Sequence, residues 1–158
     1  MSGLRTWVAG GEDAEAVARL MIAFRDHFGY RTPGDEAFRA GVRRLLGDAD
    51  TEFILAAPGG GAAIGVAVLR YRWSLWGDSP DCVLEDAYVD PAARGAGTGR
   101  ALIAFAVERA RDRGCRRMLT DTGEDNAAAL ALYHAAGFSE RGASGDGPRE
   151  LFLRLILD

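Results

Sequence analysis

Cysteine, histidine and long hydrophobic runs are scarce in this sequence. Its two cysteines, Cys82 and Cys115, have no second thiol or histidine at metal-ligand spacing, which argues against a zinc site and a disulfide scaffold. No segment approaches the roughly 18–20 consecutive apolar residues of a transmembrane helix, and the first residues lack the apolar core of a signal peptide. We therefore expect a cytoplasmic protein that binds no metal and no membrane.

The charge balance is acidic, with a net charge of −4 and an isoelectric point near 5.2. Duplex nucleic acid usually requires a dense basic surface, so we expect no nucleic-acid partner and favour a small cationic molecule. Arginines do gather locally, at Arg94 and Arg100 and again between Arg109 and Arg117. The first group could meet an anionic cofactor, whereas solvated helix charges explain most of the second.

Hydrophobic periodicity switches repeatedly between the spacings of strands and helices, with no linker or repeat. It predicts strands at Leu4–Ala9, Glu52–Ala57, Ala62–Trp73, Cys82–Val89, Arg116–Thr122, Phe138–Arg141 and Arg149–Leu157. Helices are predicted around Val17–Phe28, Phe38–Leu46, Gly97–Gly114 and Asn126–Ala136. A chain of 158 residues has the size of one domain. The sequence thus predicts a single α/β (α+β) domain over residues 1–158.

The most informative segment is a glycine-rich turn between a predicted strand and the longest predicted helix, with the sequence Arg94-Gly-Ala-Gly97-Thr-Gly-Arg100. Amides in the first turn of a helix lack internal partners and carry the positive end of its dipole, so they can hold a pyrophosphate. The dinucleotide fingerprint G-x-G-x-x-G fails because Arg100 and Leu102 occupy its last glycine position in the two possible registers. A simple flexible turn before an ordinary helix is the alternative explanation.

Two motifs in the second half of the chain resemble those of the GNAT N-acetyltransferase superfamily, closest to its small-amine members of the polyamine and aminoglycoside type. The segment Arg94-Gly-Ala-Gly97-Thr-Gly99 resembles the signature Gln/Arg-x-x-Gly-x-Gly/Ala, and Glu85-Asp-Ala-Tyr-Val-Asp-Pro91 before it resembles the central strand. Asn126, Tyr133 and Gly137-Phe138 resemble the second motif. The resemblance implies a mixed, mostly antiparallel sheet of about six to seven strands with a splayed parallel pair, flanked by four helices.

The resemblance also implies acetyl-CoA as the co-substrate and assigns its contacts. The pyrophosphate would be held beside Arg94 by the amides of Gly95, Ala96, Gly97, Thr98, Gly99 and Arg100. The pantetheine arm would pair with the backbone of Ala87, Tyr88 and Val89, and Asn126 would contact it from the other side. Tyr133 falls where many members keep a tyrosine that protonates the departing thiolate. A tyrosine packed through its ring is the alternative.

Glu85 is the candidate general base, because polyamine-type relatives place a glutamate at the matching strand position and an amine must lose a proton before it attacks. Either Glu85 or Asp86 could instead sit at a solvated edge, and a strand bulge could exchange their orientations. We expect a small primary amine as the acceptor, with a protein or peptide amine and a non-catalytic acyl-CoA-binding module as alternatives. The resemblance further suggests a homodimer.

Overall fold

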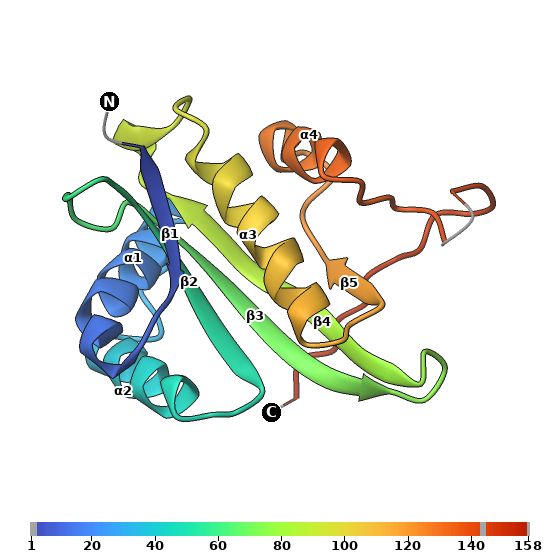
Figure 1. Ribbon diagram of the computed structural model, residues 1–158, viewed down its shortest axis with the longest axis horizontal. Helices are drawn as coiled ribbons and strands as arrows, with labels where there is room; N and C mark the ends of the chain where they lie inside the picture. Colours follow the sequence, from blue (N-terminus) through green and yellow to red (C-terminus); the bar gives the residue numbers. More distant parts are fainter. Residues whose placement is uncertain (1–2, 143–144, 158) are drawn as a thin grey trace. The chain divides into compact units, whose positions relative to one another are not determined.

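The computed structural model describes residues 3–142 and 145–157 (Figure 1). Within these residues, one sheet carries five strands in the order β1-β2-β3-β4-β5. The strands are β1 Leu4–Val8, β2 Thr51–Pro58, β3 Gly65–Ser74, β4 Ser79–Val89 and β5 Arg117–Thr120. Neighbouring strands run antiparallel except for the parallel pair β4 and β5. The mixed, mostly antiparallel sheet expected from the sequence is thereby confirmed.

Two layers of helices cover the sheet, and strand alternation determines which residues face each layer. The helices α1 Ala14–His27 and α2 Asp35–Leu46 bury Leu20 and Val42 in a core cluster with Phe53 of β2. Glu52, the neighbour of Phe53, binds Arg109 of helix α3 Thr98–Asp112. Because successive strand residues point to opposite faces, α3 covers the face opposite α1 and α2.

Contacts divide the chain into two compact units, Met1–Thr120 and Asp121–Asp158. The first holds the sheet and helices α1 to α3. The second holds the helix α4 Ala127–Ala135, which is followed by Gly137 with a left-handed φ of 99°. Nine of the eleven predicted helices and strands form close to their expected positions. No helix within the described ranges is long and apolar enough to cross a bilayer.

The two strands predicted at the end of the chain are wrong. Phe138–Arg141 and Arg149–Leu157 form one isolated antiparallel bridge, Arg141 to Arg149, and the residues that follow it carry no strand. Alternating hydrophobic residues show that a segment could lie on a half-buried sheet surface. A strand forms, however, only where its backbone can hydrogen-bond to a neighbouring strand. In the described part of the chain the sheet therefore has five strands, fewer than the six to seven expected.

Candidate functional site

The turn after β4 owes its shape to two glycines. A short 3-10 turn, Pro91–Ala93, follows the strand and is held by Asp90, whose Oδ1 accepts the Ala92 N–H at 3.2 Å. Gly95 and Gly97 then both adopt φ of 83°, in the left-handed region that side chains with a Cβ rarely enter. An added Cβ at either glycine would meet no atom within 4 Å, so the space over the turn is open to a ligand.

The turn leads directly into the start of α3. The first helical hydrogen bond runs from the Ala101 N–H to the Gly97 carbonyl at 3.0 Å. The amides of Thr98, Gly99 and Arg100 precede that bond, so the helix itself offers them no acceptor. They lie at the positive end of the helix dipole, which makes this turn a fit for the diphosphate of coenzyme A.

The start of α3 lies unusually close to the sheet because Gly65 has no side chain. A Cβ at Gly65 would lie 2.9 Å from Leu102 Cδ1 and 3.1 Å from Thr98 Cγ2. Thr98 is buried by this approach, so its hydroxyl does not reach the outer surface of the turn. Gly65 thus sets the position of the amides.

Arg94 braces the same turn against the end of β4. Its Nε donates to the Val89 carbonyl at 3.1 Å, and its guanidinium lies 6.0 Å from the ring centroid of Tyr88. The predicted neighbours of the pyrophosphate are therefore brought together at one end of β4. The arginine thereby places positive charge at the end of β4, next to the turn in sequence.

The parallel pair ends before β4 does. The register of β4 with β5 runs from Asp81–Arg117 to Leu84–Thr120 and stops there. Beyond Leu84, β4 continues to Val89 and is paired with β3, for instance Ala87 with Ala67. Among the described strands, β4 therefore has a neighbour on only one side at Ala87, Tyr88 and Val89, where the sequence predicts the pantetheine arm.

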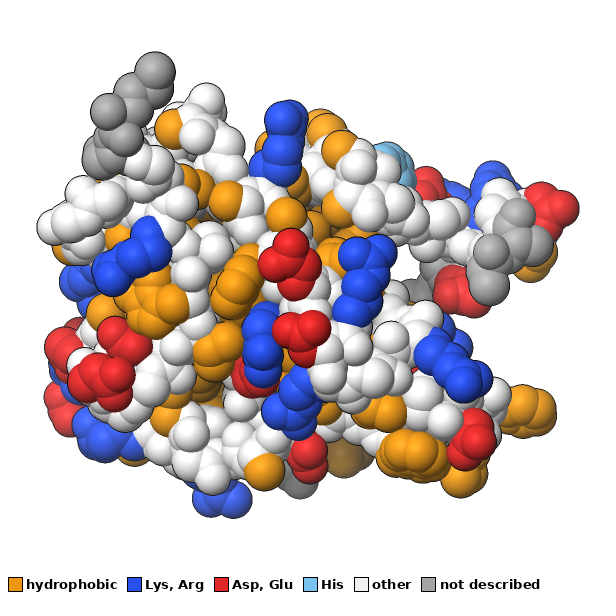
Figure 2. Space-filling model, in the orientation of Figure 1, with side chains coloured by type: hydrophobic (Ala, Val, Ile, Leu, Met, Phe, Trp, Pro, Cys, Tyr) orange, Lys and Arg blue, Asp and Glu red, His pale blue; other side chains and the backbone are white. Residues whose placement is uncertain are grey.

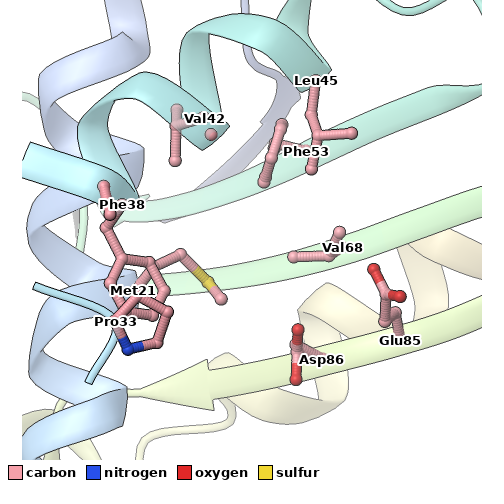
Figure 3. Close-up of a pocket in the computed structure, with 11 residues that line it drawn as sticks. Met21, Pro33, Phe38, Val42, Leu45, Phe53, Val68, Glu85 and Asp86 are labelled. Carbon is pink, nitrogen blue, oxygen red and sulfur yellow. The ribbon is translucent and has the colours of Figure 1, made fainter. Parts of the chain in front are cut away.

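Glu85 is the extra residue of a β-bulge. Val68 of β3 pairs with Asp86, whereas the next residue, Leu69, pairs with Leu84. The bulge re-aims the strand, so that Glu85 and Asp86 both line one pocket (Figure 3). The bulge considered from the sequence therefore exists, and it brings the two carboxylates together instead of exchanging them. Arg70 Nη1 lies 3.5 Å from Glu85 Oε2.

The pocket belongs to the first unit and has a volume of about 270 Å³. Helices α1 and α2 and strands β2 to β4 form it, and its remaining lining residues are Met21, Pro33, Ala37, Phe38, Gly41, Val42, Leu45, Phe53 and Val68. From the sequence we expect the loop Arg31–Glu36 to shape the acceptor pocket, and Pro33 of that loop lines this cavity, whereas the helix face beside it was not identified. The helical spacing of Phe38, Val42 and Leu45 predicted a buried helix face, but gave no signal that part of the face lines a cavity.

Arginines of the second basic cluster serve the structure. Arg109 binds the buried Glu52 through two nitrogens at 2.7 and 3.1 Å, and Arg113 approaches the same carboxylate at 3.4 Å. Burial opposes ionisation of Glu52, but the bonds from Arg109 and from the Tyr71 hydroxyl outweigh it and lower its pKa. Figure 2 shows acidic and basic side chains interspersed over α3. Arg109 and Arg113 are therefore ion-paired, whereas the sequence suggested solvated charges for most of this cluster.

Tyr133 and Asn126 lie in the second unit. Tyr133 is buried in α4, with its ring centroid 5.7 Å from that of Phe138. The Asn126 Oδ1 caps α4 by accepting the Ala129 N–H at 3.1 Å, so a contact with the cofactor would use its Nδ2. Both residues have local structural roles, and their predicted roles toward acetyl-CoA stay predictions.

The thiols of the chain are suited to packing rather than chemistry. Cys82 and Cys115 are not disulfide-bonded. Burial is the main cause that raises the pKa of Cys82 to about 12, so its reactive thiolate is scarce at neutral pH. Within residues 3–142 and 145–157, no three His, Cys, Asp or Glu residues cluster as metal ligands.

Comparison with known proteins gives the same family over most of the chain. The sequence pattern of the acetyltransferase (GNAT) family matches residues 6–138. Aminoglycoside N(6')-acetyltransferase type 1 of Stenotrophomonas maltophilia is 37% identical over 138 residues, which are 76% of this chain and 90% of that protein. Mycothiol acetyltransferase of Amycolatopsis mediterranei (strain U-32) is 36% identical over 86% of this chain, but the match spans only 46% of that longer protein.

Solved structures agree with the sequence matches. The aminoglycoside N-acetyltransferase AAC(6')-Iy in complex with CoA superimposes with a TM-score of 0.78 at 25% identity, over 98% of this chain and 96% of that one. The family expected from the two sequence motifs is confirmed by a pattern that includes both of them. This chain therefore belongs to the acetyltransferase (GNAT) family.

Proposed function

We propose that this protein transfers the acetyl group of acetyl-CoA to the primary amine of a small cationic molecule, and that residues 1–158 act as one domain. One observation carries the proposal: a single strand, β4, leads from a pocket lined by the carboxylates of Glu85 and Asp86 to the glycine turn at Gly95–Gly97. Among the strands that the structure describes, the segment between them has a neighbour on only one side, which suits an extended cofactor arm.

Each part of the site has a distinct task in this proposal. The thioester of acetyl-CoA supplies an activated acyl group. The amides of residues 95–100 hold its diphosphate, and the backbone of Ala87–Val89 orients its arm, so that much of the rate comes from positioning. Glu85, with Asp86 as the alternative, accepts the proton that the ammonium must lose. Tyr133 donates a proton to the leaving thiolate, and Asn126 contacts the arm.

A small acceptor fits better than a protein. The pocket is about 270 Å³ and carries two carboxylates, whereas a peptide would need an open groove. The names of the aminoglycoside and mycothiol relatives also point to small-molecule substrates for those proteins. We further place the protein in the cytoplasm, which two unpaired cysteines favour, and propose a homodimer, which sedimentation analysis would test.

A thiol-release assay with purified protein, acetyl-CoA and a panel of amines tests the activity. We expect release of one coenzyme A per acetylated primary amine, and no release with the matched N,N-dimethyl amine, which cannot form a neutral amide. Calorimetry with coenzyme A tests the phosphate-binding turn separately. Tight binding without turnover of any amine would favour the non-catalytic acyl-CoA module, and absence of both would refute the proposal.

A further inference from the structure

The pocket beside Glu85 and Asp86 is divided into an apolar part and a charged part. The nine other lining residues come from α1, the loop before α2, α2, β2 and β3, and none of them has an ionisable side chain. Its two charged lining residues both come from the β4 bulge. Figure 3 shows the Glu85 carboxylate directed toward Val68, with Asp86 beside it on β4. Such a pocket matches a ligand with one cationic end and one apolar end.

The volume limits the size of that ligand. A cavity of roughly 150 Å³ lined by apolar side chains is large enough for benzene. The pocket of about 270 Å³ thus has room for one ring, or a short alkyl chain, together with an aminoalkyl group. It could not enclose a molecule of several linked sugar rings. The hydroxyl groups of such a molecule would also lose their hydrogen bonds to water against Phe38, Val42 and Leu45.

The carboxylates also provide a counter-charge for an ammonium group. Glu85 and Asp86 both line the pocket, and Arg70 Nη1 lies 3.5 Å from Glu85 Oε2. A polyamine would place its second cation among the apolar side chains of α2, where a charge has no partner in the pocket lining.

We infer that the acceptor is a primary amine on a compact apolar group, an alkylamine or arylalkylamine, whose ammonium faces Glu85 and Asp86 and whose apolar part lies against α2. This inference rests on the proposed acetyl transfer, because it names the acceptor of that same site. Such an acceptor differs from the aminoglycosides that the names of several relatives print.

The first test compares acceptors of different polarity. We expect kcat/KM for 2-phenylethylamine to exceed that for ethanolamine by about 100-fold or more, because an apolar pocket discriminates by about 10-fold or more per buried methylene. Spermidine and kanamycin should fall below 2-phenylethylamine as well. A higher kcat/KM for ethanolamine, spermidine or kanamycin would overturn the inference while leaving the proposed acetyltransferase activity intact.

The second test fills the pocket at Gly41. This residue lines the pocket from α2, and a Cβ built there would meet no atom within 4 Å. Leucine is also a better helix former than glycine, so Gly41→Leu should fold. We expect it to lower kcat/KM for 2-phenylethylamine about 10-fold or more and that for ethylamine less, with Gly41→Ala intermediate. Arg44→Leu, on the exposed side of α2, is the matched control and should leave both values unchanged.

A binding measurement keeps the inference testable without turnover. Ligand-observed NMR with 2-phenylethylamine should show binding to the unmodified chain and to Arg44→Leu, with a loss in Gly41→Leu. Absence of binding, or equal binding in Gly41→Leu, would overturn the inference. If 2-phenylethylamine binds in this way but no amine is acetylated, the pocket assignment stands and the proposed function fails.

Discussion

Glu85 and Asp86 are consecutive residues of β4, yet both line the same pocket. In a regular strand, neighbouring side chains point to opposite faces of the sheet. The register shift between Val68 and Leu69 inserts Glu85 as an extra residue, which breaks that alternation. The result is a pair of carboxylates on the side of the sheet where α1 and α2 form an apolar cavity (Figure 3).

The carboxylate pair gives the first prediction. If Glu85 is the general base, Glu85→Gln should lower kcat by about 10²-fold, with unchanged affinity for coenzyme A. Asp86→Asn should act mainly on KM, because it removes charge that attracts the ammonium. Steady-state kinetics and calorimetry on both variants measure these effects. A larger loss of kcat in Asp86→Asn would transfer the role of base to Asp86.

The glycine turn gives the second prediction. Gly97 has a φ of 83°, so any other residue there strains the backbone by about 1–2 kcal/mol. Gly97→Glu should in addition place a carboxylate near the diphosphate and abolish measurable binding of coenzyme A, whereas Gly97→Gln carries the strain without the charge. Calorimetric titration should therefore show residual binding for the glutamine variant alone. Full affinity in Gly97→Glu would contradict the assignment of the turn.

Tyr133 gives the third prediction. Tyr133→Phe should lower turnover by about 10²-fold if the hydroxyl protonates the thiolate, while coenzyme A binding stays nearly intact. The packing of the ring with Phe138, at 5.7 Å between centroids, should be kept in this variant. Thermal denaturation serves as the control for folding. Unchanged kcat in a folded variant would leave Tyr133 with its packing role only.

The buried carboxylate of Glu52 gives a prediction on stability. Tyr71 donates to it at 2.9 Å and Arg109 through two nitrogens, so Glu52→Gln should lower the free energy of unfolding by about 2 kcal/mol. Glu36→Gln, which removes an exposed pair with Arg39, is the control and should change it by less than about 1 kcal/mol. Urea denaturation at pH 7 compares the two, and equal effects would contradict the proposed importance of burial.

The Glu52 carboxylate should also make the free energy of unfolding depend on pH. The folded-state pKa of Glu52 is lowered, so the unfolded chain binds the proton more readily than the folded chain. The stability from this group is complete above the unfolded pKa of about 4.3 and is lost as the pH falls through the lower folded-state pKa. Urea denaturation between pH 7 and pH 3 should show a smaller acid loss in Glu52→Gln. Parallel curves would rule out this contribution.

The features that the sequence alone determined are those that depend on residues close together in the chain. Hydrophobic spacing predicted the four helices and the five strands of the sheet, because periodicity records which side of an element is buried. The turn from Gly95 to Gly97 was equally readable, since glycine permits the left-handed backbone and the first amides of any helix lack partners. The two motifs around Arg94 and Tyr133 were sufficient to indicate the family, which the match over residues 6–138 confirms.

Tertiary structure alone decided the features that depend on two distant segments. The bulge at Glu85 is a register between β3 and β4, and the pocket exists only where α2 meets those strands. Similarly, the sequence suggests that Arg109 is a solvated charge on the surface of a helix. Only the packing of α3 against β2 shows that it binds Glu52. The segment Arg149–Leu157 has the alternation of a strand but forms only one bridge, at Arg149. In each case the outcome depends on the partner surface, and a periodic pattern carries no information about the partner.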